Sequence, residues 1–281
     1  MNPQSGTLYI IATPIGNLDD ISSRAIEVLS KVDICASEDT RKSKILFDHY
    51  QIKTRLISYH KFSERKKLSY FIDQLNLGKN IALISDAGTP LISDPGHILV
   101  EQVLAENINI KPIPGVSAVT SALSVSGLPI ENFIFYGFPP RKGKERFLFL
   151  EKFNKEDITS VIFESGLRIE KFLAEIIAVT PEREVFISRE MTKVFETFYR
   201  GSVVDVLQEI VEDSYGTKGE FVLIFSGIKA KNLYKEYSIE ERRIIDILLK
   251  NLPNKTAFSL ASKILQVNKN KLYKNFIDNK D

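Results

Sequence analysis

The residues best suited to chemistry lie in one loop, Ser85–Gly96, which follows the short apolar run Ile81–Ile84. Two carboxylates, Asp86 and Asp94, stand there among glycines and prolines. Glycine lets a backbone approach a ligand and adopt a positive φ, whereas proline fixes φ and removes a hydrogen-bond donor. Because both occur together, we expect a rigid, shaped loop rather than a linker. At the carboxyl end of a strand, such a loop is typical of a small-molecule site.

Two earlier segments also place polar residues after predicted strands. Thr13–Asn17, with its single glycine, is read as a tight turn. Glu38–Arg41 is read as the start of a helix, where acidic residues favour the positive end of the helix dipole. That interpretation leaves Arg41 unexplained, and an arginine at this position is suited to holding a phosphate.

Pro114–Ala118 is a third candidate loop. Gly115 permits close approach to a ligand, and Ser117 is either a helix cap or a hydroxyl that faces a ligand. We interpret this loop and Ser85–Gly96 as the ends of adjacent parallel strands, which predicts that the two loops share a small-molecule pocket.

Basic residues mark loops in the second half of the chain. The segment Gly137–Arg146 combines prolines and glycines with Arg141, Lys142, Lys144 and Arg146. A run of charge is usually a solvated face, but a loop at the start of a domain favours contact with substrate. Arg168 and Arg189 also follow predicted strands. For Arg189, Glu190 and Lys193, a structural ion-pair network is an equally good interpretation.

Several classes of protein are disfavoured by what the sequence lacks. It contains neither the Gly-x-Gly-x-x-Gly pattern of a dinucleotide site nor a phosphate-binding loop ending in Gly-Lys-Ser/Thr. The single cysteine, Cys35, lies in an apolar run and is interpreted as a core residue. Because His49, His60 and His97 show no metal-ligand spacing, we expect no metal site.

The elements that must position these residues form an α/β protein with two domains and a tail. In residues 1–118, strands alternate with helices, which predicts a mainly parallel sheet with helices on both faces. Residues 119–228 are denser in strands and predict a second α/β domain with a mixed sheet. Residues 229–281 predict a polar linker and two or three short helices, at about 240–249, 256–265 and 268–276.

Charge is distributed unevenly in a chain of ordinary composition. Of 281 residues, 43% are hydrophobic and 26% charged, with a net charge of +2. The tail from Lys229 onward contains 12 Lys/Arg and 6 Asp/Glu, a net charge of +6. Such a tail indicates either a polyanionic partner or a lysine-rich solvated helical segment. The sequence shows no secretory leader and no membrane span, so a cytoplasmic location is expected.

Taken together, these segments resemble the tetrapyrrole methylase superfamily, the class III S-adenosylmethionine-dependent methyltransferases. The resemblance covers essentially the whole chain. Within the superfamily the chain is similar to the ribosomal RNA small subunit methyltransferase I branch, and Leu252-Pro253 with Leu272-Tyr273 resembles that branch's helical tail. The matching segments, in order, are Thr13–Asn17, Glu38–Arg41, Ser85–Gly96, Pro114–Ala118, Arg189–Lys193 with Phe195–Thr197, and Lys218–Val222.

The resemblance implies 2′-O-methylation of a cytidine ribose in the decoding region of 16S rRNA, within the small ribosomal subunit. It also implies S-adenosylmethionine as cofactor, two α/β domains with the cofactor in the cleft, and a homodimer. The expected cofactor-binding residues are Pro14, Asp86, Gly88, Thr89, Leu91, Ile92, Ser117, Ala118 and Phe163.

Methyl transfer to a ribose hydroxyl needs a proton acceptor, and Glu38, Asp39 and Glu190 are the candidates. The expected RNA-binding residues are Arg41, Arg141, Lys142, Lys144, Arg146, Arg168, Arg189 and Lys193. One departure from the branch stands out: its usual Glu-Ser-Pro-His-Arg is here Glu164-Ser165-Gly166-Leu167-Arg168, so no role as a base can be given to the position of the missing histidine.

Two other functions remain open at the level of sequence. One is a methyltransferase of the same fold that acts on a porphyrinoid or another small substrate and has no use for a basic tail. The other is an RNA-binding assembly factor that retains a cofactor pocket without catalysis.

Overall fold

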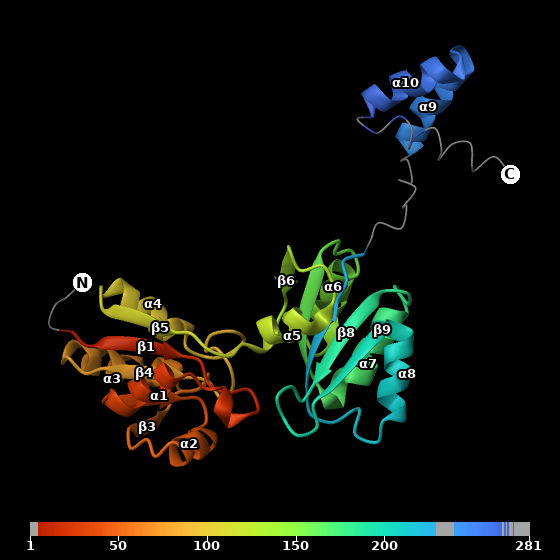
Figure 1. Ribbon diagram of the computed structural model, residues 1–281. Helices are drawn as coiled ribbons and strands as arrows, with labels where there is room; N and C mark the ends of the chain where they lie inside the picture. The colour runs from red at the N-terminus through yellow and green to blue at the C-terminus, as the bar shows by residue number, and fades with distance from the viewer. Residues whose placement is uncertain (1–4, 229–238, 266, 268, 270–271, 273–281) are drawn as a thin grey trace. The chain divides into compact units, whose positions relative to one another are not determined.

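The computed structural model describes residues 5–228, 239–265, 267, 269 and 272. The chain divides into two compact units, Met1–Ile228 and Lys229–Asp281, and each is described by itself. The larger unit contains two five-stranded sheets (Figure 1). In the described part of the chain, no helix is long and apolar enough to cross a membrane.

The first sheet is entirely parallel, with strand order β3-β2-β4-β1-β5. Its strands are β1 (Thr7–Ile11), β2 (Ile34–Ser37), β3 (Arg55–Ser58), β4 (Ile81–Ile84) and β5 (Asn109–Ile113). The connecting helices are η1 (Leu18–Asp20), α1 (Ser23–Lys31), α2 (Thr40–His49), α3 (Glu64–Asn76) and α4 (His97–Ala105). The predicted parallel sheet is thus confirmed.

Helices cover both faces of this sheet, and its three central strands, β2, β4 and β1, are accordingly apolar on both faces. Along β1, Leu8 and Ile10 belong to the core cluster shared with α3 and α4, while Tyr9 and Ile11 belong to the cluster shared with α1 and α2. Side chains alternate between the faces of a strand, so a strand buried on both faces needs an uninterrupted apolar run. Cys35 lies fully buried in the second cluster, as predicted.

The strands before the two predicted pocket loops are not neighbours, and on this point the sequence interpretation was wrong. β1 lies between β4 and β5 and pairs with both. The loops nevertheless meet above the end of β1, where Thr89 Oγ1 donates to the Val116 carbonyl at 3.0 Å. Because parallel strands share one carboxyl edge, loops separated by one strand can still contact each other.

The second sheet is mixed, as predicted, with strand order β6-β7-β10-β8-β9. Only β6 and β7 pair in parallel, and the other neighbours are antiparallel. Its strands are β6 (Phe133–Phe135), β7 (Thr159–Ser165), β8 (Glu184–Arg189), β9 (Thr197–Ser202) and β10 (Glu220–Phe225). Its helices are α5 (Ala118–Ser126), α6 (Gly143–Phe153), α7 (Gly166–Ile177) and α8 (Val203–Glu212).

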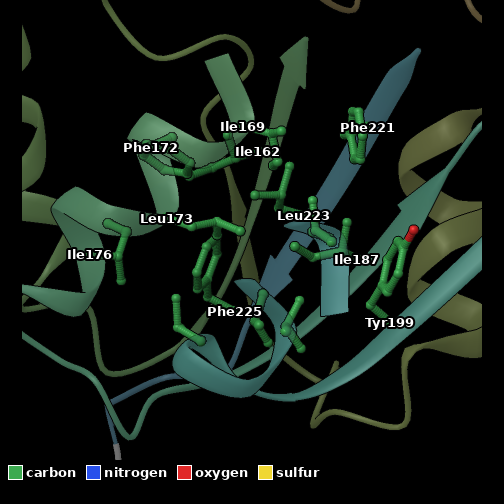
Figure 2. Packing of buried hydrophobic residues seen from close by; sticks show 14 of the residues in the cluster. Ile162, Ile169, Phe172, Leu173, Ile176, Ile187, Tyr199, Phe221, Leu223 and Phe225 are labelled. Atoms are coloured by element: carbon green, nitrogen blue, oxygen red, sulfur yellow. The ribbon is translucent and has the colours of Figure 1, made fainter. Parts of the chain in front are cut away.

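Helices also cover both faces of the second sheet. Val119, Ala122 and Leu123 of α5 pack on one face. Residues of α6, α7 and α8 form a larger core on the other. Figure 2 shows Phe172, Leu173 and Ile176 of α7 beside strand residues of that core.

The second unit contains α9 (Ile239–Asn251) and α10 (Asn254–Ile264). Ile245, Phe258, Ala261 and Leu272 form its small buried core. These two helices match the predicted helical module. The third predicted helix, at about 268–276, falls largely outside the described residues.

The buried aromatic core of the second sheet gives a stability prediction. Phe172 has no exposed surface, so Phe172→Ala is expected to lower the free energy of unfolding by about 3–5 kcal/mol, through lost burial and the cavity left behind. Phe147 on α6 is 66% exposed, so Phe147→Ala is expected to change the free energy of unfolding by about 0.5 kcal/mol or less. Urea unfolding of both variants is the measurement, and equal losses would contradict this packing.

Candidate active site

A cavity of about 400 Å³ lies between the carboxyl edge of the first sheet and the ends of β7, β8 and β10. It brings together most of the residues expected to hold a cofactor. Those that line it are Asp86, Thr89, Ile92, Ser117, Ala118 and Phe163. Glu38, Glu190 and Lys193, expected to serve in catalysis or RNA binding, also line it.

A second cavity, of about 420 Å³, adjoins the first. Residues Thr13–Gly16, the end of β4 and side chains of α2 line it, and Pro14 is therefore here rather than in the first cavity. Two further cofactor candidates, Gly88 and Leu91, line neither cavity. The residues common to both linings are Ile15, Lys42, Asp86, Ala87, Lys193 and Glu220.

The Ser85–Gly96 loop is a constrained structure, as its glycines and prolines predict. Gly88 has φ +75° and Gly96 φ +128°, and the non-glycine residues Leu91 and Ser93 also have positive φ, at +74° and +72°. Left-handed conformations of this kind cost a non-glycine residue about 1–3 kcal/mol and are retained mainly near functional sites. Gly88 is tied to Thr13 by two backbone hydrogen bonds, of 2.9 and 3.0 Å.

Asp86 links this loop to α2. Its Oδ1 accepts from the Asp39 backbone N–H at 2.9 Å, and its Oδ2 accepts from Lys42 Nζ at 2.7 Å. An aspartate in such a loop often caps its own turn, but here the carboxylate reaches across to the loop that follows β2. The loops after two neighbouring strands, β4 and β2, are thereby joined at the cavity wall.

Asp39 lies outside both cavities and serves the helix instead. Its side chain caps α2 by accepting from the Arg41 backbone N–H, and it also accepts from Arg41 Nε at 3.0 Å and Nη2 at 2.7 Å. These hydrogen bonds hold the pKa of Asp39 well below its usual range. An acid so firmly ionised and paired is a poor proton acceptor. Arg41 itself is 89% exposed.

Of the six acids that line the first cavity, three come from the first sheet's loops: Glu38, Asp86 and Asp94. Burial, followed by the charges of Glu38 and Asp86, raises the pKa of Asp94 to about 7. Burial and the charge of Asp86 also raise the pKa of Glu38. Sequence reasoning noted Asp94 as the second carboxylate of its loop but did not include it among the site residues. Its burial depends on contacts that only the fold provides.

Among the residues common to both cavities, Lys193 bridges two acids. Its Nζ lies 2.9 Å from both Glu190 Oε1 and Glu220 Oε2. Burial raises the pKa of Glu190, but hydrogen bonds from Lys193 and from the Glu220 backbone outweigh it, so the net change is downward. A side chain at Gly219, where φ is +100°, would put Cβ 2.6 Å from the Glu190 carboxylate, so the arrangement requires glycine there.

Two of the predicted RNA-binding arginines are buried, so the structure does not support that role for them. Arg189 is 5% exposed; its Nε donates to the Lys218 carbonyl at 2.8 Å, and its Nη1 lies 3.7 Å from Asp213 Oδ2. Arg146 is 8% exposed, and its Nε donates to Glu175 Oε2 at 2.9 Å. Both guanidinium groups are used within the fold.

The other basic residues of the 137–146 loop remain exposed, namely Arg141, Lys142 and Lys144. Two arginines fix this loop: Arg168 Nη2 donates to the Pro139 carbonyl at 2.8 Å, and Arg146 Nη1 donates to the Pro140 carbonyl at 3.2 Å. Arg168 also lies 3.2 Å from the buried Glu164. Arg168 thus acts first as a support for the loop.

Local packing requires glycine at position 166. Its N–H donates to the Gly219 carbonyl at 3.0 Å, and a Cβ would lie 2.2 Å from the Thr217 carbonyl oxygen. Proline, which lacks the N–H and carries a ring, cannot occupy this position. The departure from the branch's usual Pro-His is therefore consistent with the course of the 217–219 segment. The next residue, Leu167, is 99% exposed.

Comparisons with known proteins agree with this architecture. Residues 7–207 match the family model of Tetrapyrrole (Corrin/Porphyrin) Methylases. The chain is 43% identical over 270 residues to a Pseudomonas aeruginosa protein, covering 96% of each chain. It is also 43% identical over 270 residues to an Escherichia coli O157:H7 protein, covering 96% of this chain and 94% of the other. Both are named ribosomal RNA small subunit methyltransferase I.

Solved structures with the same fold are more distant in sequence. A cobalt precorrin-4 methyltransferase has a TM-score of 0.59 at 22% identity, covering 78% of this chain and 94% of its own. A diphthine synthase has a TM-score of 0.61 at 13% identity, covering 79% of this chain and 90% of its own. With the family model matched over most of its length, the chain belongs to the tetrapyrrole methylase family, whose members are S-adenosylmethionine-dependent methyltransferases.

Proposed function

We propose that this methyltransferase transfers a methyl group to the 2′-hydroxyl of a cytidine ribose in the decoding region of 16S rRNA, within the small ribosomal subunit. The full-length similarity to proteins named ribosomal RNA small subunit methyltransferase I supports the choice of substrate. The observation that carries the proposal is the pair of adjoining cavities with a shared wall of ion pairs. Action in the cytoplasm and as a homodimer is part of the same proposal and rests on the resemblance.

The first cavity fits S-adenosylmethionine. Its volume lies within the roughly 300–1,000 Å³ usual for small-molecule sites. Ile92, Phe163 and Val222 give it apolar surface suited to an adenine, and Thr89 and Ser117 contribute hydroxyls. Glu164 also lines it; its buried Oε2 accepts no hydrogen bond among the described residues, although it lies 3.2 Å from Arg168 Nη2. When bound, the cofactor supplies a methyl group on a positively charged sulfur.

The three acids give this cavity an unbalanced negative charge. Lys42 pairs with Asp86, but burial and neighbouring carboxylates raise the pKa values of two other acids: Asp86 acts on Glu38, and Glu38 and Asp86 act on Asp94. An amine and a sulfonium brought among them would relieve that repulsion. Binding of a cationic ligand is therefore favoured by the residues themselves, before any contact specific to its shape.

The second cavity is suited to the acceptor nucleotide. Lys42 and Lys193, in the wall common to both cavities, offer ammonium groups to the phosphates on either side of a ribose. Holding the acceptor oxygen in attack geometry supplies much of the rate in such a transfer. Of the three candidate bases, Glu38 is the best, because its pKa is raised, whereas the pKa values of Asp39 and Glu190 are lowered.

RNA outside the cavities would meet exposed positive charge. Arg141, Lys142 and Lys144 stand on a loop whose Phe138 lines the first cavity. The tail from Lys229 onward carries a net charge of +6. Phosphate contacts of this kind make affinity fall steeply with salt.

The proposal is tested by incubating the protein with S-adenosylmethionine labelled in its methyl group and with small ribosomal subunits that lack the modification. Label is expected in a single cytidine of 16S rRNA, resistant to alkali at its 3′ side because the 2′-hydroxyl is blocked. Nuclease digestion and mass spectrometry locate it. Label in a base, in a small molecule or in no RNA would reject the proposed reaction.

The role of the Ser85–Gly96 loop is tested with Asp86→Ala and Gly88→Val. The first removes the acceptor shared by Lys42 and the Asp39 backbone, and the second places a β-branched residue at φ +75°. Each is expected to weaken S-adenosylmethionine binding at least about tenfold in calorimetry, a cost of about 1.4 kcal/mol. Asp73→Ala, at an exposed position on α3, is the control and should bind normally. Normal binding by folded Asp86 and Gly88 variants would place the cofactor elsewhere.

Asp94 gives a prediction for pH dependence. Its pKa in the folded protein, about 7, lies above the ordinary 3.8, so the folded state binds more protons than the unfolded state between these values. The contribution of Asp94 to the free energy of unfolding is therefore lost as pH rises from about 4 to 7. In urea unfolding, the free energy of unfolding of Asp94→Asn should decline less over that pH range than that of the wild type. Parallel profiles for the two proteins would contradict the raised pKa.

A further inference from the structure

Five loops follow the carboxyl ends of the strands in the first sheet. One of these loops contributes no residue to the lining of either cavity. Residues after β1, β2, β4 and β5 line the cavities. None of the residues 55–67, which span β3 and the loop after it, does so. This loop still lies beside the site, because β3 pairs with β2 and the Tyr59 N–H donates to the Ser37 carbonyl at 2.7 Å.

The loop after β3 displays an aromatic ring from a firmly held backbone. Phe62 is 88% exposed, although Tyr59, Ser63 and Glu64 around it are buried. Ser63 Oγ accepts from the His60 N–H at 3.0 Å, and Glu64 Oε1 accepts from the Gly96 N–H at 2.6 Å. The exposed ring therefore does not stabilise the fold by burial, and its removal leaves the supports of the loop in place.

Positive charge surrounds this ring. Lys61, Arg65 and Lys66 are exposed, and none of them pairs with an acid in the part of the chain that the structure describes. Nearby acids are already engaged: Asp39 by Arg41, and Glu64 by the Gly96 backbone. We refer to Lys61, Phe62, Arg65 and Lys66 as the β3-loop patch.

The β3-loop patch directly follows a residue that lies near the cavity. His60, next to Lys61, is close enough to Glu38 to be the smallest of the influences on the pKa of that carboxyl, after burial and Asp86. The His60 and Phe62 rings lie edge to face with centroids 6.2 Å apart. A strand of RNA whose ribose lies near Glu38 thus has the β3-loop patch within reach of its adjoining nucleotides.

We propose that the β3-loop patch binds the single-stranded RNA beside the methylated nucleotide, with an unpaired base stacked on Phe62 and phosphates held by the three cations. An exposed aromatic ring interleaved with basic residues is the usual means of holding single-stranded nucleic acid, since every base has a face that can stack. This inference rests on the proposed function and adds to it the residues that hold the flanking strand.

Stacking is tested with Phe62→Ala, Phe62→Leu and Phe62→Tyr, and with Leu77→Ala as control. Leu77 is 72% exposed and lies just beyond the other end of α3. Phe62→Ala is expected to raise the KM for small subunits by about tenfold and to leave kcat and S-adenosylmethionine binding unchanged. Phe62→Leu should behave like alanine, because it keeps an apolar side chain but has no ring. Phe62→Tyr should restore the KM, and Leu77→Ala should match the wild type.

The cations are tested by charge reversal at Lys61, Arg65 and Lys66 together, with Lys79→Glu as control. Lys79 is exposed near the carboxyl end of α3, away from the patch. Binding of a fluorescein-labelled oligocytidine RNA is measured by anisotropy between about 50 and 200 mM salt. The triple variant is expected to bind more weakly, with a shallower dependence on salt, whereas Lys79→Glu should retain the wild-type slope.

The outcomes separate this inference from the function on which it rests. If wild-type protein methylates subunits and Phe62→Ala keeps its KM within twofold, the inference fails alone. If Phe62→Ala raises the KM for subunits but binds the oligonucleotide normally, the patch contacts a ribosomal protein and RNA stacking is rejected. If wild-type protein binds the oligonucleotide through Phe62 but transfers no methyl group, the proposed function fails and the inference stands. Binding of the oligonucleotide unaffected by all patch variants overturns the inference in every case.

Discussion

Parallel pairing of β1 with β4 on one side and β5 on the other is the constraint on which the site depends. It directs the loops after all five strands of the first sheet to one edge. The pairing between Thr13 and Gly88 then fixes the height of the longest loop above the sheet. Because both faces of this sheet are buried, a slip of one residue would exchange the side chains that pack in the two cores and displace the loops together.

At the wall common to both cavities, lysines offset the charge of the acids through ion pairs, and the charged groups remain there. Lys42 and Lys193 each contact acids from other segments, so the wall between the cavities is made of side chains rather than backbone. Long ion-paired side chains at a partly exposed wall can change partners at small energetic cost, because such pairs contribute only about 0–1 kcal/mol each. A phosphate can therefore draw the lysines away from Asp86 or Glu220 without disrupting the sheets behind them.

Much of the architecture could be predicted because the relevant signals are local. Apolar runs marked the strands, and serine, a preferred N-cap residue, is found at the start of α1, where Ser22 Oγ accepts from the Ala25 N–H at 3.1 Å. Predictions failed where a partner was distant in sequence. Arg146 was expected to face RNA because its local neighbours are basic, yet Glu175, on another helix, takes its guanidinium. The raised pKa of Asp94 could not be predicted either, because it depends on burial by residues distant in sequence. Nor does the local pattern of residues indicate which strands are neighbours in the sheet.

The contact between Gly166 and the Thr217 carbonyl has a consequence for how this chain can change. A Pro-His pair introduced at 166 and 167 alone would lose the hydrogen bond to Gly219 and force the proline ring into the 217–219 backbone. The two segments are therefore epistatic: proline at 166 becomes acceptable only after the opposing turn has taken another course. The choice of residue at position 166 is thus set by the course of a segment about fifty residues further along the chain.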